Sequence, residues 1–232
     1  MNIVVLTGAG ISAESGLNTF RDNGGLWEGH RMEEVATPEA FEANPALVQH
    51  FYNLRRQQLL SSDVNYNAAH KALAEFEAAG SHQLTLVTQN VDDLHQRAGS
   101  RAVLAMHGEL RKARCQLCDA VQLWDEDISD DSICGHCQQP GGLRPHIVWF
   151  GEMPFYMEEI ERALQGCDLF VSIGTSGVVY PAAGFQQLAQ HCGAKTVELN
   201  LAPSDTASRF DQTIYGNATQ IVPAFFAQLD SV

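Results

Sequence analysis

The sequence predicts an α/β fold built on a doubly wound parallel sheet. Apolar runs of four to six residues, rich in β-branched side chains, recur along the chain, and each ends in a polar or glycine-containing loop. Between these runs lie segments with apolar residues at helical spacing, which end at glycine. Such alternation is typical of a parallel sheet covered by helices on both faces. Ligands of these sheets bind beyond the carboxyl ends of the strands, so the polar residues there are the first site candidates.

The individual elements follow from this alternation. Valine, leucine, isoleucine and threonine dominate the apolar runs, and they favour buried strands. In the clearest helical segment, Ala69, Leu73 and Phe76 share one face, and Gly80 ends the pattern. We expect strands at 2–7, 84–88, 102–106, 169–173 and 196–199, and helices at 68–79 and 182–192.

Length and composition describe an ordinary globular protein. The chain has 232 residues, of which 45% are hydrophobic and 18% are charged, and no apolar run approaches the roughly 20 residues of a membrane span. The first ten residues have no basic segment and indicate a buried first strand rather than a signal peptide. The formal net charge of −14 disfavours a nucleic-acid backbone as main ligand, although solubility alone explains this charge equally well. We expect a cytoplasmic monomer that binds neither nucleic acid nor membranes.

Four of the six cysteines form two Cys-x-x-Cys pairs separated by fifteen residues. Each pair can direct two thiolates at one ion, and two pairs complete the tetrahedral sulfur shell that structural zinc prefers. The intervening segment is acidic and poor in apolar residues, so it needs such a cross-link to fold. The alternative is four unrelated buried cysteines. The predicted zinc ligands are Cys115, Cys118, Cys134 and Cys137.

A zinc ion bound by four sulfurs leaves the nearby histidines without a metal to bind. His136 lies inside the second pair and could compete as a ligand, whereas Cys167 and Cys192 stand alone and are expected in the core. His107 follows the apolar run 102–106 and precedes Gly108, so it is expected at the end of a strand. A histidine there is either a core residue with satisfied hydrogen bonds or part of a crevice shared with the other loops.

The loop after the first strand fits the pattern G-x-G-x-x-[GA]. In such loops backbone amides approach a pyrophosphate at a helix start, but the match alone is weak. A dehydrogenase also needs an acidic residue at the end of a second strand, about twenty positions on. Residues 20–34 contain no strand to carry one. The loop therefore indicates a dinucleotide, while hydride transfer is poorly supported.

Taken together, these motifs resemble the sirtuins, the NAD-dependent protein-lysine deacylases. "GAGISAESGLNTFR", "TQNVDDLH", "HGEL", the two cysteine pairs, "FGE" and "GTS" stand in the order found in that family, and they span nearly the whole chain. The closest resemblance is to the bacterial CobB-type branch, class III. It implies a Rossmann-like NAD-binding domain at 1–27, 65–110 and 145–232. It also implies an inserted small domain, made of a helical module at 28–64 and a zinc ribbon at 111–144.

The resemblance also implies roles for single residues. His107 would be the general base, and an imidazole pKa near 6.5 suits that task. Asn90 and Asp92 would hold the nicotinamide carboxamide, which offers both a donor and an acceptor. NAD would be the co-substrate, beside one structural zinc per chain. The implied NAD-binding residues are Gly8, Ala9, Gly10, Ser12, Ala13, Glu14, Phe20, Arg21, Trp27, Gln89, Asn90, Val91, Asp92, Gly174, Thr175, Ser176, Asn200, Leu201, Ala202 and Ala218.

The segment "HIVWFGE", residues 146–152, is interpreted as an exposed strand edge. An extended acyl-lysine peptide could pair with such an edge by β-augmentation, and the alternative is an ordinary core strand. The substrate residues predicted here are Val148, Trp149, Phe150, Gly151 and Glu152.

A second substrate prediction concerns the acyl group. Tyr52 and Arg55 are three positions apart on an expected helix, so they share a face and could bind a carboxylate together. In class III sirtuins the matching pair reads the distal carboxylate of succinyl- and malonyl-lysine, and Ala36 matches the position that leaves room for it. The alternative is a solvated arginine on an amphipathic helix, which is the interpretation we give to Arg56.

The predicted activity is NAD-dependent removal of acetyl, succinyl and malonyl groups from acyl-lysine in proteins or peptides. The products would be nicotinamide, O-acyl-ADP-ribose and free lysine. Two other functions stay open at this point. A mono-ADP-ribosyltransferase using the same NAD site would differ in product mass. A non-enzymatic module built on the zinc ribbon would release no nicotinamide.

Overall fold

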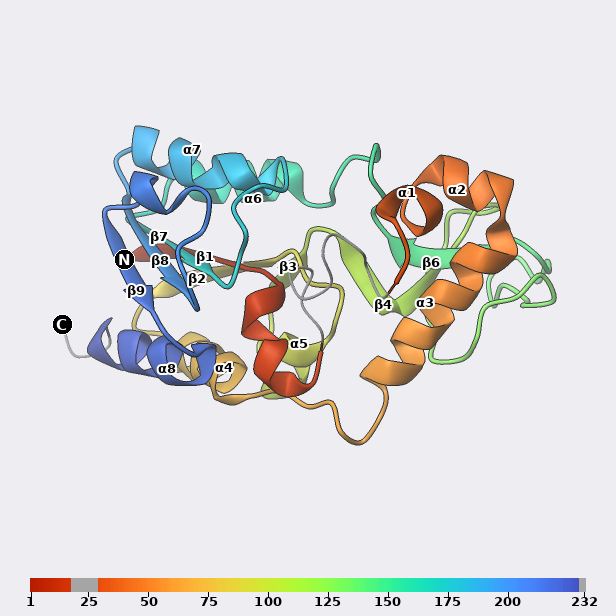
Figure 1. Cartoon of the computed structure of the whole chain (residues 1–232), viewed down its shortest axis with the longest axis horizontal. Helices are drawn as coiled ribbons and strands as arrows, with labels where there is room; N and C mark the ends of the chain where they lie inside the picture. The colour runs from red at the N-terminus through yellow and green to blue at the C-terminus, as the bar shows by residue number, and fades with distance from the viewer. Residues whose placement is uncertain (18–28, 230–232) are drawn as a thin grey trace.

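The centre of the molecule is a six-stranded parallel sheet with the strand order β3-β2-β1-β7-β8-β9 (Figure 1). The computed structural model describes residues 1–17 and 29–229. β1 pairs with both β2 and β7, so the chain winds outward in opposite directions from the middle of the sheet. This reversal is the topological switch point at which doubly wound sheets bind ligands. The strands are β1 (Asn2–Thr7), β2 (Gln83–Thr88), β3 (Val103–Ala105), β7 (Leu169–Ile173), β8 (Lys195–Asn200) and β9 (Gln212–Tyr215).

Helices cover both faces of this sheet (Figure 1). Successive side chains of a strand point to opposite faces, so Ile3 and Val5 enter one apolar cluster while Val4 and Leu6 enter another. The first cluster lies under α4 and α8, and the second under α6 and α7. The helices are α4 (Ala68–Ala79), α8 (Ala218–Leu229), α6 (Met157–Gln165) and α7 (Phe185–His191), and a short α5 (Leu94–Ala98) follows β2.

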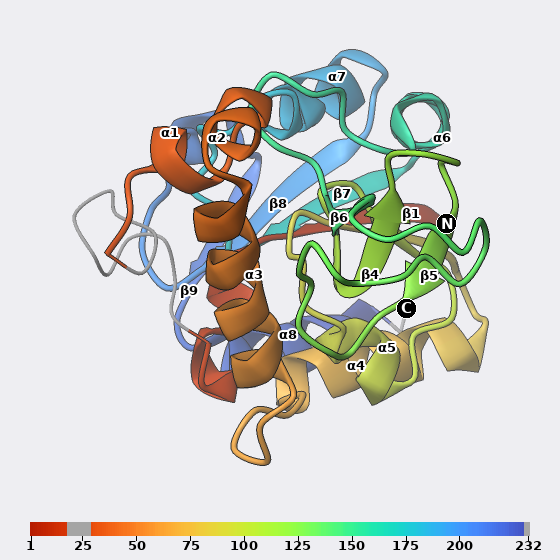
Figure 2. The ribbon, with the colours of Figure 1, turned by 90° about the vertical axis from the view of Figure 1, so that its right-hand side faces the viewer.

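A smaller part lies beside the sheet and contains three helices and a three-stranded antiparallel sheet of order β5-β4-β6 (Figure 2). One apolar cluster joins its helices to β4, β6 and the residues that follow β6. Its elements are α1 (Met32–Val35), α2 (Pro38–Ala43), α3 (Pro45–Leu59), β4 (Gly108–Cys115), β5 (Val121–Leu123) and β6 (Leu143–Ile147).

α3 is the longest helix of this smaller part. The Asn44 side chain accepts a hydrogen bond from the backbone N–H of Leu47 at 3.1 Å, and Pro45 suits the first turn because it has no N–H to leave unpaired. Its buried face includes Val48 and Tyr52, whose spacing of four residues places them one turn apart. The helix therefore presents one face to the small sheet.

The predicted fold class is confirmed, and four of the expected strands agree with β1, β2, β7 and β8 within one residue. β3 is shorter than the expected 102–106, and the helix expected at 68–79 is α4. α4 ends because Gly80 takes a left-handed conformation with φ of 70°. The predicted domain ranges stay a prediction. β4 begins at Gly108, before the expected start of the zinc ribbon at 111, and β6 begins at Leu143, before the expected return to the NAD-binding domain at 145. Among residues 1–17 and 29–229, no helix combines the length and apolar character that a membrane span requires.

Candidate active site

The loop after β7 is bonded through its backbone to the loop after β1 and to β8. Gly10 donates to the Gly174 carbonyl at 2.9 Å, and Gly174 donates to the Leu199 carbonyl at 2.9 Å. A Cβ atom on Gly10 would lie 2.7 Å from the Gly174 Cα, and Gly174 has a φ of 62°. Both positions therefore require glycine, the first for close approach and the second for its left-handed backbone. The result is a tight floor at the switch point.

Three predicted residues meet above this floor through the Ser12 hydroxyl. Ser12 Oγ accepts from Asn90 Nδ2 at 3.1 Å and donates to Asp92 Oδ2 at 3.0 Å. The other carboxylate oxygen of Asp92 accepts from the backbone N–H of Leu94 at 3.1 Å. Ser12, Asn90 and Asp92 are all buried. The loops after β1 and β2 thus hold an amide and a carboxylate in one polar cluster.

Burial raises the pKa of Asp92 to about 6, although the hydrogen bonds from Leu94 and Ser12 oppose the shift. Because this pKa is higher in the folded chain than in the unfolded chain, protonated Asp92 contributes to the free energy of unfolding, and this contribution is complete below about pH 4. The contribution of Asp92 is lost as the pH rises through about 6. The ionised carboxylate is therefore kept in the site at a cost to stability.

We expect Asp92→Asn to raise the free energy of unfolding at pH 8 by up to about 2 kcal/mol, because it removes a charge from a buried position. The gain should vanish near pH 4, which urea unfolding at the two pH values would measure. Asp93→Asn is the matched control. Asp93 binds Arg97 at 2.7 Å and Arg111 at 2.9 Å, so its neutralisation should destabilise the protein. A loss of stability at pH 8 in Asp92→Asn would contradict the expectation.

Behind this cluster lie two buried histidines that the sequence analysis did not select. His70 Nδ1 accepts from the Asn67 backbone N–H at 3.3 Å, which leaves His70 Nε2 as the donor toward Ser12 Oγ at 3.4 Å. The His95 ring lies 4.9 Å from the His70 ring, and burial lowers the pKa of both. A histidine within the apolar stripe of the helix at 68–79 is the signal that could have identified His70.

His107 follows β3 and faces the loop after β2. Its Nδ1 lies 3.0 Å from the Gln89 carbonyl, and a carbonyl only accepts, so Nδ1 carries the proton. In the neutral ring Nε2 then has the free lone pair. Burial lowers the pKa of His107, although the bond to Gln89 opposes this shift, so the neutral ring prevails at pH 7. The backbone N–H of Leu110 donates to the Val91 carbonyl at 2.8 Å, which joins β4 to the loop after β2.

A second group of the predicted NAD-binding residues lies at the ends of β7 and β8. Asn200 Nδ2 donates to the Thr175 carbonyl at 2.8 Å, and Thr175 Oγ1 lies 3.0 Å from Ser172 Oγ. Glu14 has a different partner, since its carboxylate accepts from the backbone N–H and hydroxyl of Thr219 at the start of α8. This contact ties the first loop to α8, where Ala218 lies half-buried.

The remaining predicted NAD-binding residues differ in exposure. Ser176 is half-buried, and the exposed ones are Ala9, Ala13, Leu201 and Ala202. Phe20, Arg21 and Trp27 lie outside the described residues.

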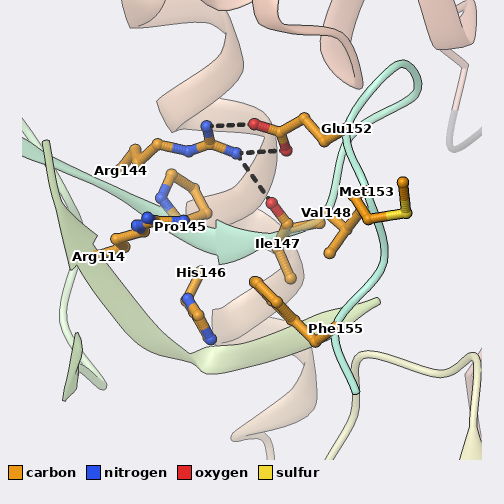
Figure 3. A pocket seen from close by; sticks show the side chains of 9 residues that line it. All are labelled: Arg114, Arg144, Pro145, His146, Ile147, Val148, Glu152, Met153 and Phe155. Carbon is orange, nitrogen blue, oxygen red and sulfur yellow. Dashed lines mark hydrogen bonds and ion pairs between the residues drawn. The ribbon is translucent and has the colours of Figure 1, made fainter. Parts of the chain in front are cut away.

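The interpretation of 146–152 as one strand edge is wrong, because β6 ends at Ile147 and a turn follows. The Glu152 carboxylate closes that turn by accepting from the Trp149 backbone N–H at 2.8 Å and from Arg144 (Figure 3). Trp149 is 2% exposed, whereas Phe150 is 51% exposed. The backbone N–H of Val148 donates to the His107 carbonyl at 2.9 Å. Val148 therefore lies next to the candidate catalytic histidine, and the exposed Phe150–Gly151 corner follows it in the chain.

The residues predicted to read the acyl group belong to the cluster beneath this turn. Ala36 and Tyr52 are buried there with Trp149, and the Phe150 backbone N–H donates to the Ala36 carbonyl at 2.9 Å. Arg55 is half-buried and lies over the Phe51 ring, 5.1 Å from its centroid. The turn after β6 is thus joined to α3 through the packing of Trp149 with Tyr52.

The interpretation of Arg56 as a solvated arginine is wrong, because its side chain is only 1% exposed. Arg56 donates to the carbonyls of Leu110 at 2.8 Å and Glu126 at 3.2 Å, and to Asn53 Oδ1 at 2.9 Å. Asn53 in turn exchanges two hydrogen bonds of 2.9 Å with the backbone of Ile128. These polar contacts dock α3 on the segment between the cysteine pairs.

The four paired cysteines converge, with their sulfur atoms within 4.8 Å of one another. Cys115 lies 3.8 Å from Cys137, and Cys118 lies 3.8 Å from Cys134. Zn–S bonds of about 2.3 Å in a tetrahedron require sulfur separations of about 3.8 Å, so the cluster fits a structural zinc ion. His136 does not belong to this group. Cys167 is buried as expected, but Cys192 is exposed, so the expectation of a core thiol there is wrong.

Residues 8–181 match the family model described as the Sir2 family. The chain belongs to the Sir2 family. Curated relatives from this family align over nearly the whole chain. A protein of Pasteurella multocida is 58% identical over 228 residues, covering 98% of this chain and 97% of the relative. A protein of Escherichia coli K12 is 55% identical over 227 residues, covering 98% and 81%. Both relatives are named NAD-dependent protein deacylase.

Solved Sir2 structures share the fold. A Sir2 homolog in complex with NAD superposes with a TM-score of 0.88 and 36% identity, covering 99% of this chain and 89% of the other. A second Sir2 protein, in complex with a deacetylated p53 peptide and 3′-O-acetyl ADP ribose, has a TM-score of 0.82 and 29% identity, covering 97% and 92%. The sequence resemblance to the sirtuins is thereby confirmed, and the Sir2 fold accounts for both the parallel sheet and the cysteine cluster.

Proposed function

We propose that this Sir2 family protein is an NAD-dependent protein-lysine deacylase that removes acetyl, succinyl and malonyl groups. The observation that carries the proposal is the convergence of His107, Asn90 and Asp92 at the switch point of the parallel sheet. The relatives named deacylases support the same activity. Bound NAD would supply a ribose carbon that accepts the acyl oxygen as nicotinamide leaves. The overall reaction converts acyl-lysine, NAD and water into lysine, nicotinamide and O-acyl-ADP-ribose.

The geometry of the first loops suits a dinucleotide. Gly8 and Gly10 have no side chain, so a ligand can approach the backbone at the switch point. The amide of Asn90 and the carboxylate of Asp92 offer a donor and an acceptor to a carboxamide. Asn90 Nδ2 has a second N–H and Asp92 Oδ2 a further lone pair, so each could bind the carboxamide and keep its present bond to Ser12 Oγ.

His107 would act as general base on a ribose hydroxyl. Its Nδ1 proton is committed to the Gln89 carbonyl, so Nε2 accepts the proton and the ring leaves the step as imidazolium. The Gln89 carbonyl then faces a charged donor, and such hydrogen bonds are stronger than neutral ones. A neutral histidine at pH 7 is the competent state, which agrees with the lowered pKa of His107.

The acyl-lysine would enter over the Phe150–Gly151 corner, because Val148 already contacts the His107 backbone. α3 lies against the same turn through Tyr52 and Trp149. A longer acyl group would extend toward α3, where Tyr52 and Arg55 could bind its distal carboxylate. Ala36 has the smallest chiral side chain and is buried in this cluster, where a larger side chain would occupy more of the volume beside Tyr52.

We expect Arg55→Met to lower kcat/KM for a succinyl-lysine peptide about ten- to a hundredfold more than for the acetyl-lysine peptide. The reason is that a charge-assisted hydrogen bond is lost only with the succinyl group, at about 1.5–3 kcal/mol. Steady-state assays of nicotinamide release with the two matched peptides measure this ratio.

Arg56→Met is the matched control for this experiment, since it changes the neighbouring guanidinium on the same helix. Arg56 donates to backbone carbonyls and is not proposed to contact the substrate. Its loss should therefore lower the stability of the protein and reduce deacetylation and desuccinylation alike. Equal losses with both peptides in Arg55→Met would show that Arg55 supports the fold instead of reading the acyl group.

Two further points belong to the proposal. The names of the relatives favour deacylation over mono-ADP-ribosylation, and the mass of the product separates the two reactions. We also propose that the protein acts as a monomer in the cytoplasm on acyl-lysine-bearing proteins, without nucleic acid. The net charge of −14 supports the last point, because it repels phosphate backbones.

A further inference from the structure

Trp149 makes a directional contact with the residue proposed to read the acyl group. Its indole Nε1 lies 3.0 Å from the Tyr52 hydroxyl, and the two rings are tilted by 37° with centroids 6.4 Å apart. An indole N–H is a donor only, so the Tyr52 oxygen must accept. The phenol hydrogen therefore points away from the indole.

Arg144 and Glu152 together hold Trp149 in place. The Arg144 guanidinium lies over the Trp149 ring, 3.5 Å from its centroid, which is a close cation–π contact. The same guanidinium binds both oxygens of Glu152, at 2.8 and 3.0 Å, and the Ile147 carbonyl at 2.9 Å (Figure 3). Glu152 completes the ring of contacts by accepting from the Trp149 backbone N–H. The direction of the indole N–H is thus fixed by the turn that follows β6.

The direction of that N–H matters because a phenol has one hydrogen and can donate only once. Burial raises the pKa of Tyr52 well above its ordinary value, so the phenol keeps its hydrogen at any working pH. A phenol that donated toward Trp149 could offer a carboxylate only a lone pair, and two acceptors repel each other. A donor-only neighbour excludes that orientation.

We propose that Trp149 is a positioning residue for acyl specificity, whose indole N–H fixes the Tyr52 phenol as the donor to the distal carboxylate of a dicarboxylic acyl-lysine. This inference rests on the proposed deacylase function and names succinyl and malonyl groups as the ligands concerned. Trp149 does not touch the acyl group. It acts through Tyr52, and Arg144 with Glu152 keeps it in place.

The test is Trp149→Phe, which retains an aromatic ring and removes the donor. The KM for a succinyl-lysine peptide should rise about three- to tenfold relative to the KM for the matched acetyl-lysine peptide, since one neutral hydrogen bond is lost. In a Tyr52→Phe background the same substitution should leave the ratio of the two KM values unchanged, because the group that Trp149 orients is gone.

A purely structural role of Trp149 would change both KM values alike or would persist in the Tyr52→Phe background, and either result overturns the inference. Glu152→Gln weakens the contacts with Arg144 and the Trp149 backbone but keeps the indole. This variant is a second test, and it should also lower the preference for succinyl-lysine. Thermal unfolding confirms that each variant is folded.

The Arg55→Met variant separates this inference from the proposed function. If Arg55→Met lowers the succinyl preference and Trp149→Phe does not, only the role of Trp149 is overturned. If the wild-type protein removes no succinyl group, both the proposed acyl specificity and the role of Trp149 fail.

Discussion

Replacement of His107 by alanine is expected to slow deacylation by about a hundredfold to ten-thousandfold while the fold survives. The variant loses the only imidazole that the described residues place beside both the Asn90–Asp92 loop and Val148. The hydrogen bond that is lost, from His107 to the Gln89 carbonyl, is worth about 1 kcal/mol. Turnover of acetyl- and succinyl-lysine peptides, with circular dichroism to verify folding, measures the effect.

His82→Ala is a suitable control, since His82 is also half-buried but precedes β2, at the opposite end of that strand from Gln89, and stacks on Phe76. It should retain its activity. The pH dependence gives a second readout. Because burial lowers the pKa of His107, wild-type kcat/KM should decline only as the pH falls below about 6.5, when the ring becomes protonated. A folded His107→Ala variant with wild-type turnover would remove His107 from the mechanism.

The parallel sheet could be predicted from sequence because its central strands are buried on both faces and appear as continuous apolar runs. β1, β7 and β8 are of this kind, and their limits agree closely with expectation. β9 escaped prediction because it pairs on one side only and its four residues are largely exposed, so no apolar run marks it. The end of β6 was misjudged because the apolar residues Val148 and Trp149 continue the pattern past the strand.

The contacts of the site depended more on tertiary structure than on local pattern. The cysteine cluster and the glycine loop carry their own spacing and were predicted. Arg56 lies one turn after Tyr52 on the buried face of α3, but its hydrogen-bond partners at Leu110 and Glu126 are distant in the chain and could not be predicted locally. Likewise Glu14 could not be linked to Thr219 from sequence, because the start of α8 reaches the first loop only in the folded chain.

The zinc ribbon is connected through α3 to the proposed substrate residues Tyr52 and Arg55. The ribbon has a small apolar cluster of its own, made of Ala113, Cys115, Ile128, Cys134 and Leu143. Two of its five buried members are predicted zinc ligands, so the metal replaces a core that the segment lacks. Asn53 and Arg56 bind the backbone of residues 126–128, and Tyr52 and Arg55 lie on the same helix. Loss of the metal should therefore reach the acyl site, although zinc takes no part in the reaction.

We expect Cys134→Ser, or treatment with a strong chelator, to remove one zinc ion per chain and abolish deacylation. The apparent binding free energy of structural zinc is about 10–16 kcal/mol, so its loss should unfold β4–β6 and release α3, while the parallel sheet keeps its own cores. Metal analysis, activity and hydrogen exchange measured on the same samples should show protection lost in the small part first. Cys192→Ser is the matched control, because Cys192 is exposed outside the cluster and its replacement should leave zinc content and activity intact. Soluble, fully active protein without zinc would contradict this account of how the small part is held together.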